Sequence, residues 1–313
     1  IWNASRLIIT NMDKVKSGPV AEPQWTLADS WIWARLQELV RDVERLFQSY
    51  QYGEAGRQIY DFFWSEFADW YLEIAKLQLN EGGDRTYYTG YNLVCILDIC
   101  LRLLHPFIPF VTEEIWGHLR HSLQGTPLSS VDANWPAALI IAPWPEPEAP
   151  EGWEKESISN FILIQDAIRS IRNIRAEKDV KPRRLIPAWL SAGDKTEVFR
   201  QQKGILAALA QLDPEKLTIS STLPPKQEND IVIAIGEVEI YLPLEGLMDI
   251  EKERARLTTL LLETNRQIER LDHLLSSSFA ERAPAEIVQK EREKLSSYSA
   301  TAETVKNQLE KLG

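Results

Sequence analysis

The chain has 313 residues, of which 44% are hydrophobic and 26% are charged, and its formal net charge is -11. These values are typical of a globular protein of two or three domains. No stretch approaches the roughly 18 consecutive apolar residues that a membrane-spanning helix needs, and no basic segment leads into an apolar one as in a secretory signal. We therefore expect a cytoplasmic protein with no membrane partner, whose acidic balance argues against a uniformly basic nucleic-acid-binding surface.

The two cysteines, Cys95 and Cys100, lie in an apolar run, and the four histidines do not complete a set of zinc ligands. We expect both thiols to be buried and reduced. The sequence also lacks a glycine-rich phosphate-binding loop and any arrangement of residues that indicates a hydrolase. We therefore assign no catalytic residue, metal or cofactor to this chain.

The first 145 residues predict a bundle of helices, because apolar residues recur at intervals of three and four. The expected helices run from Trp2 to Met12, from Trp31 to Phe47, from Tyr52 to Leu79, from Arg85 to Leu104, and onward from Thr112. A loop covers Lys14 to Thr26, and we expect Asp29 or Ser30 to cap the helix that follows it.

The third of these helices is dense in aromatic residues between Tyr60 and Tyr71. Such a pattern suggests base stacking, but aromatics at helical spacing more often fill a core, and we predict that they do so here. Asp69 and Glu73 lie among them, and we expect them to pair with Arg102 or with another cation of the bundle.

A loop rich in proline, serine and glycine extends to about Gly152, and a small α/β module is expected over residues 146–248. Its predicted helices run from Lys155 to Ala176 and from Glu197 to Gln211, and its predicted strands from Leu185 to Ser191, Leu217 to Ser220, Ile231 to Ile235 and Val238 to Leu242. Pro187 predicts that the first strand lies at a sheet edge. Gly236 and Glu237 predict a hairpin turn between the last two strands.

One segment is basic in an otherwise acidic chain. Between Gln165 and Ile186 only three acids accompany seven bases, which are Arg169, Arg172, Arg175, Lys178, Lys181, Arg183 and Arg184. A local excess of four positive charges can bind phosphate. The alternative, a solvated helix surface without a ligand, stays open on the sequence alone.

The last 65 residues, 249–313, carry the clearest pattern. From Leu257 to Leu275, and again from Val288 to Leu312, apolar residues recur at alternating steps of three and four, which is typical of a coiled coil. A break at Ser276–Ser278 separates the two stretches, so we expect an antiparallel pair of helices, each roughly 40 Å long. The predicted fold class is therefore mainly α, with a helical bundle, a small α/β module and a C-terminal antiparallel two-helix coiled coil.

Several segments, taken in order, resemble the valyl-tRNA synthetases. They are Ile1–Arg6, Trp64–Glu73, Leu103–Trp116, Ala142–Pro145, Ile171–Glu177, Tyr241–Leu247 and Arg282–Val288. The isoleucyl enzymes are similar in the bundle but commonly carry a cysteine cluster near the carboxy end, and the leucyl enzymes end in a compact domain. The coiled coil therefore favours valine, while the equivalent part of an isoleucyl or leucyl enzyme, or a free-standing tRNA-binding or adaptor module, remains an alternative.

The resemblance implies an anticodon-binding bundle of the class I type, an arm against the outer corner of an L-shaped tRNA, and tRNA(Val) as partner. The two ATP-binding motifs of class I synthetases are absent here. ATP and Mg, together with the editing function, are therefore expected in a catalytic part that precedes this chain in the same polypeptide. The chain opens at Ile1 rather than at Met, so we expect a fragment that does not aminoacylate alone and is monomeric.

The candidate tRNA-binding residues fall into three sets. Asn3 and Arg6 lie near the first turns of the bundle, next to Trp2, where a guanidinium can contact an unstacked base. The phosphate candidates of the basic segment and of the arm are Arg169, Arg172, Arg175, Lys181, Arg183, Arg266, Arg270, Lys290 and Lys294. For each of them, an ordinary surface ion pair is the alternative.

Overall fold

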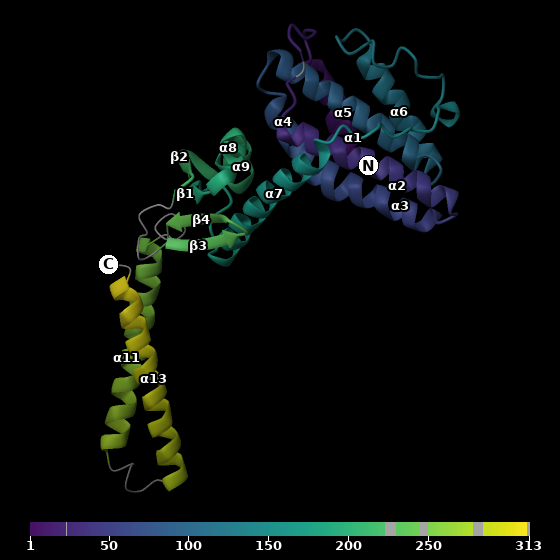
Figure 1. Ribbon diagram of the computed structural model, residues 1–313. Coiled ribbons are helices and arrows are strands. Elements are labelled where there is room, and N and C mark those ends of the chain that lie inside the picture. Colours follow the sequence, from purple (N-terminus) through teal and green to yellow (C-terminus); the bar gives the residue numbers. More distant parts are fainter. Residues whose placement is uncertain (23, 223–229, 244–249, 278–283, 312–313) are drawn as a thin grey trace.

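The computed structural model describes residues 1–22, 24–222, 230–243, 250–277 and 284–311. Figure 1 shows a helical bundle, a small sheet module beside it, and a two-helix arm that extends away from both. The predicted fold class is confirmed, because helices dominate and one four-stranded sheet separates the bundle from the arm.

The bundle is built from helices. They are α1 (Trp2–Asn11), η1 (Met12–Lys14), α2 (Leu27–Gln48), α3 (Tyr52–Asp61), η2 (Phe62–Tyr71), α4 (Leu72–Gln78), α5 (Gly83–Leu104), α6 (Pro109–Leu123) and the short turn η3 (Leu139–Ile141). Their apolar sides face one core, in which Trp31, Phe67, Tyr71 and Trp116 are among the largest fully buried side chains. Both cysteines pack in α5, and burial raises the pKa of the Cys95 thiol to about 12.

Helices α2 and α6 begin earlier than predicted. Thr26, rather than Asp29 or Ser30, is the N-cap of α2, and Asp29 is the third helical residue of a reciprocal capping box. Asp29 also accepts a hydrogen bond from the Tyr71 hydroxyl and forms an ion pair with Arg85, so its buried carboxylate has partners on two other helices. Helix α6 begins at Pro109 rather than at Thr112, because proline needs no hydrogen-bond acceptor in the first turn of a helix.

The aromatic helix is continuous from α3 through α4, as predicted, but its middle segment η2 is π-helical. Five of its aromatics are buried, which confirms the core interpretation for most of them. Tyr60 and Trp64 are exceptions, with 61% and 51% of their surface exposed. Arg102 pairs with Asp98 of its own helix and with neither of the two acids. The second alternative is confirmed for Glu73, whose carboxylate pairs with Lys76, another cation of the bundle, at 2.6 Å.

Helix α7 (Glu154–Glu177) joins the bundle to the module. Its first half packs against α2, where Phe161 stacks on Trp31 with the ring centroids 4.1 Å apart. Its second half packs against α9 and the sheet through buried residues such as Ile171. The same continuous helix therefore belongs to two hydrophobic cores.

The module contains β1 (Ile186–Ser191), η4 (Gly193–Lys195), α8 (Thr196–Gln201), α9 (Lys203–Ala210), β2 (Leu212–Ser220), β3 (Asp230–Ile235) and β4 (Val238–Pro243). The strand order is β2-β1-β4-β3, with β1 parallel to β2 and the predicted hairpin formed by β3 and β4. The prediction that β1 lies at an edge is wrong. Pro187 is tolerated inside the sheet because four residues of β2 lie opposite it and β4 pairs only with Trp189–Ser191.

The arm consists of α11 (Ile250–Ser276) and α13 (Ala285–Lys311), which run antiparallel in Figure 1. The predicted apolar stripe faces the partner helix, since Leu257, Leu271, Val288, Ala302 and Val305 are buried. Thr264 is also buried in this stripe, and its hydroxyl donates to the carbonyl of Leu260 at 2.8 Å. Parts of the motifs at Tyr241–Leu247 and Arg282–Val288, as well as Leu312, lie outside the described residues.

Candidate nucleic-acid interface

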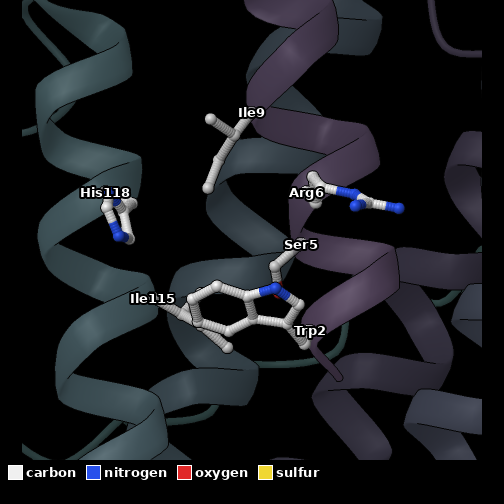
Figure 2. Close-up of a pocket in the computed structure, with 6 residues that line it drawn as sticks. All are labelled: Trp2, Ser5, Arg6, Ile9, Ile115 and His118. Atoms are coloured by element: carbon white, nitrogen blue, oxygen red, sulfur yellow. The ribbon is translucent and has the colours of Figure 1, made fainter.

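A shallow pocket of about 190 Å³ lies between α1 and α6. Its lining residues are Trp2, Ser5, Arg6, Ile9, Ile115 and His118. Ile8 and Ser5 pack α1 on the bundle and are buried, as is Ile115 of α6, whereas Trp2 and Arg6 are exposed. In Figure 2 the indole of Trp2 lies across the space between the two helices, beside Ile115.

The rim of this pocket combines an apolar surface with polar groups. The Trp2 ring, 48% exposed, meets the His118 ring edge-on with the centroids 6.1 Å apart. The Nε2 atom of His118 lies 3.1 Å from a carboxylate oxygen of Glu114. The guanidinium of Arg6 points to the other side of α1 (Figure 2), is exposed, and forms no ion pair with any residue in the described ranges.

These groups suit an unstacked base better than a phosphate. A base needs a flat apolar surface, which the exposed indole offers, and a polar group near its edge, which the His118 ring offers from the facing helix. Asn3, one turn before Arg6 on α1, is also exposed and adds an amide near the same helix end. The sequence identified Asn3 and Arg6, but it gave no signal for His118, because α6 is distant along the chain.

The basic segment divides into two groups in the structure. Arg169 and Arg172 lie over the indole of Trp70, with their guanidinium carbons 5.1 and 5.7 Å from the ring centroid. Arg169 also pairs with Asp166 at 3.1 Å, and the Nε atom of Arg172 donates to the carbonyl of Leu209 at 2.8 Å. Both side chains are exposed. The aromatic partner of these arginines belongs to the bundle, and sequence reasoning missed it.

Arg175 differs from its two neighbours because it is buried, with 5% of its surface exposed. Its guanidinium donates to the carbonyls of Lys181, Arg184 and Gln211 and to the Gln211 side chain, at 2.7 to 3.3 Å. Burial, followed by the charge of Arg184, lowers the pKa of Arg175. The role of Arg175 is structural: it holds the turn after α7 against the start of β2. Lys181 and Arg183, in that turn, remain exposed.

The candidates on the arm lie at the surface of both helices. Arg266 and Arg270 of α11 are exposed. On α13, Lys290 pairs with Glu286 at 3.2 Å and Lys294 pairs with Glu291 at 2.8 Å. Exposed pairs of this kind contribute only about 0–1 kcal/mol and exchange readily for another anion. The geometry therefore leaves these cations accessible to a phosphate backbone.

The described residues show neither a metal-binding cluster nor a membrane-spanning helix. No group of three or more histidine, cysteine, aspartate or glutamate side chains there is arranged to hold a metal ion. Likewise, none of the helices in those ranges is long and apolar enough to span a membrane.

Comparisons with known proteins place these surfaces in a family context. The anticodon-binding domain of tRNA ligases matches residues 29–188, which include α2 to α7 and the basic segment. The tRNA-binding arm of valyl-tRNA synthetases matches residues 249–313. The first match includes α6, which forms one side of the pocket, and the basic segment, while α1 precedes it. The second match includes the candidates on the arm.

Whole-chain relatives agree with these matches. The valine–tRNA ligases of Carboxydothermus hydrogenoformans and Geobacillus stearothermophilus are each 35% identical to the chain, over 99% and 100% of its length. The valine–tRNA ligase of Bacillus subtilis is 33% identical over 100% of the chain. In each case the match spans 34% of the relative, so the chain corresponds to about a third of these proteins.

Proposed function

Because the chain belongs to the valine–tRNA ligase family, we propose that it holds tRNA(Val) at two separated places, the anticodon and the outer corner of the L-shaped molecule. In this proposal residues 1–145 recognise the anticodon, residues 146–248 connect, and residues 249–313 form the arm that contacts the corner. The arm matches a module of the valyl enzymes, which favours valine over the isoleucyl and leucyl alternatives.

One observation carries the proposal. The two regions that match RNA-binding modules are separate bodies, and the arm extends far from the bundle in Figure 1. A folded RNA that is contacted at two distant places needs two RNA-binding regions that are far apart. A short single-stranded ligand needs only one such region. Helix α7 fixes the spacing between the bundle and the module, since it is packed into both.

We propose the pocket between α1 and α6 as a contact for an anticodon-loop base. Trp2 would supply a stacking surface, and the exposed side chains of Arg6 and Asn3 would supply donors to the phosphates that flank the base. The exposed cations Lys181, Arg183, Arg266, Arg270, Lys290 and Lys294 would contact the backbone. These contacts are far from any bond that reacts, so the residues position the substrate and do not take part in catalysis.

For the whole protein we propose attachment of valine to tRNA(Val) at the expense of ATP, in the cytoplasm, by a monomer. ATP and its Mg would bind in the part that precedes this chain, since the chain contains neither of the ATP-binding motifs of class I synthetases. The 313-residue chain alone would then bind tRNA without aminoacylating it.

The test is a binding measurement with the 313-residue chain. A transcript of tRNA(Val) should be retained on a filter with an affinity that falls as salt rises, and labelled ATP should not be retained. A tRNA of the same length with another anticodon should bind more weakly. Equal affinity for tRNA(Val) and for an unrelated RNA duplex would refute specific recognition.

A further inference from the structure

The junction between the bundle and the module carries two arginines that converge on one indole. Arg169 and Arg172 are three residues apart on α7, which places them about 4.5 Å apart along the helix axis. Their guanidinium groups both lie over Trp70 of η2, at 5.1 and 5.7 Å from the ring centroid. Trp70 is itself buried, with 6% of its surface exposed, so its ring is held rigidly beneath the two guanidinium groups.

The charge of this pair is poorly compensated by the protein. Asp166, an exposed carboxylate one turn earlier, forms the ion pair with Arg169. Arg172 hydrogen-bonds to a neutral carbonyl, that of Leu209, and forms no ion pair within the described part of the chain. Two like charges held close together repel each other unless an anion lies between or above them. The arrangement therefore favours an anionic ligand.

Stacking also prepares the two side chains for one kind of anion. A guanidinium that lies on an aromatic ring keeps its N–H donors free in the plane of the group, and these donors match two oxygens of a phosphate. Because the ring and the Leu209 carbonyl already fix the side chains, less rotamer entropy is lost when a ligand binds. The aromatic ring of the site, that of Trp70, is buried beneath the two guanidinium groups, so it offers no stacking surface to a base.

We propose that Arg169, Arg172 and Trp70 form a phosphate clamp for the backbone of the bound tRNA, between the anticodon contact and the arm. This inference rests on the proposed function and adds a third contact of stated chemistry. The clamp binds backbone independently of sequence. Helix α7 is packed into both the bundle and the module, so it fixes the spacing between them. Because the clamp lies on the same helix, α7 would also fix the position of the RNA strand that crosses this junction.

The structural alternative is that the two arginines only fasten α7 to η2 and α9. A matched control separates the two roles. Asp42 and Arg45 of α2 form an ion pair with the same spacing along the helix and the same 3.1 Å distance as Asp166 and Arg169. Among the cation–π contacts of the described residues, Arg169 has an aromatic partner and Arg45 has none. The double variant Arg169→Gln/Arg172→Gln and the control Arg45→Gln are made in the 313-residue chain, with melting curves recorded for each.

Binding of a tRNA(Val) transcript is then measured over a range of salt concentrations. For the double variant we expect the slope of log affinity against log salt to become shallower by about two, with at least roughly tenfold weaker binding at low salt. Arg45→Gln should match the wild type. Arg169→Lys/Arg172→Lys keeps both charges and should keep the wild-type slope.

The outcomes are distinguishable. If the wild-type chain does not bind tRNA, the proposed function fails. If it binds and the glutamine double variant has the wild-type affinity and slope, the clamp is wrong, whatever the change in melting temperature. A lysine double variant with the shallow slope of the glutamine variant would also contradict it. Ethylation of tRNA phosphates offers a second readout, because adjacent phosphates that interfere with wild-type binding should cease to interfere with the double variant.

Discussion

Phe161 of α7 stacks on Trp31 of α2, with the ring centroids 4.1 Å apart and the planes inclined by 20°. Both rings are buried, and the contact joins the helix that leads into the module to α2 of the bundle. Offset aromatic stacking contributes about 0.5–1.5 kcal/mol beyond the burial of area. The contact therefore fixes the direction in which α7 leaves the bundle, and with it the position of the basic surface.

Replacing Phe161 by alanine should lower the free energy of unfolding by roughly 3–5 kcal/mol, since a large buried ring leaves a cavity. Phe161→Leu should cost less, because it keeps most of the volume. Urea denaturation followed by circular dichroism measures both. A loss below about 1 kcal/mol for the alanine variant would mean that α7 is not anchored by this stack.

Replacing Trp2 by alanine should weaken tRNA binding by roughly 1–3 kcal/mol if one base stacks on the indole. The melting temperature should hardly change, because Trp2 is 48% exposed. Trp64→Ala is the matched control, since that ring is 51% exposed and lies on η2 rather than at the pocket. Equal losses of affinity in the two variants would argue against a specific role for the pocket.

Removal of residues 249–313 should leave a folded protein. The two helices of the arm make most of their contacts with each other, so the bundle and the module keep their own cores without them. The truncated chain should still melt cooperatively in calorimetry, while its affinity for tRNA(Val) decreases. A broad, non-cooperative transition would show that the arm is part of the folding unit.

Alkaline pH should reveal the environment of Tyr91. The neighbouring Cys95, and then burial, raise the pKa of Tyr91 to about 12, whereas an unfolded tyrosine loses its proton near pH ~10. The unfolded state then binds fewer protons in this window, so the stability contributed by Tyr91 is complete below pH ~10 and is lost as pH rises toward ~12.

Tyr91→Phe should therefore lose stability less steeply than the wild type between pH ~10 and ~12, while the two curves run parallel at neutral pH. Melting temperatures recorded across the alkaline range measure the difference. Identical slopes in that window would mean that the phenol ionises alike in the folded and unfolded chains.

Patterns that depend on local periodicity were predictable from the sequence. The apolar steps from Leu257 onward predicted an antiparallel helix pair, and the β-turn at Gly236 predicted the β3–β4 hairpin, because side-chain spacing alone decides which face of an element is apolar. The excess of basic residues after Gln165 was also predictable, because the charge of a segment follows directly from its residue types.

Features that depend on the partner of a residue were not predictable. Pro187 lies inside the sheet because β2 bulges opposite it. Arg175 is buried because its guanidinium donates to the carbonyls of the following turn and to that of Gln211, which is 36 positions away. The indole against which Arg169 packs belongs to Trp70, nearly a hundred positions earlier in the chain. In each case a tertiary contact overrode what the residue type indicates, and one sequence contains no signal for such contacts.

Cleavage protection tests the central claim most directly, because it locates the RNA contacts of the intact chain. With end-labelled tRNA(Val), the 313-residue chain should protect two separate regions, the anticodon loop and the outer corner where the D and T loops meet. The chain without residues 249–313 should protect the first region only. Protection confined to one region by the complete chain, or spread evenly along the molecule, would contradict a scaffold that holds an L-shaped RNA at two distant places.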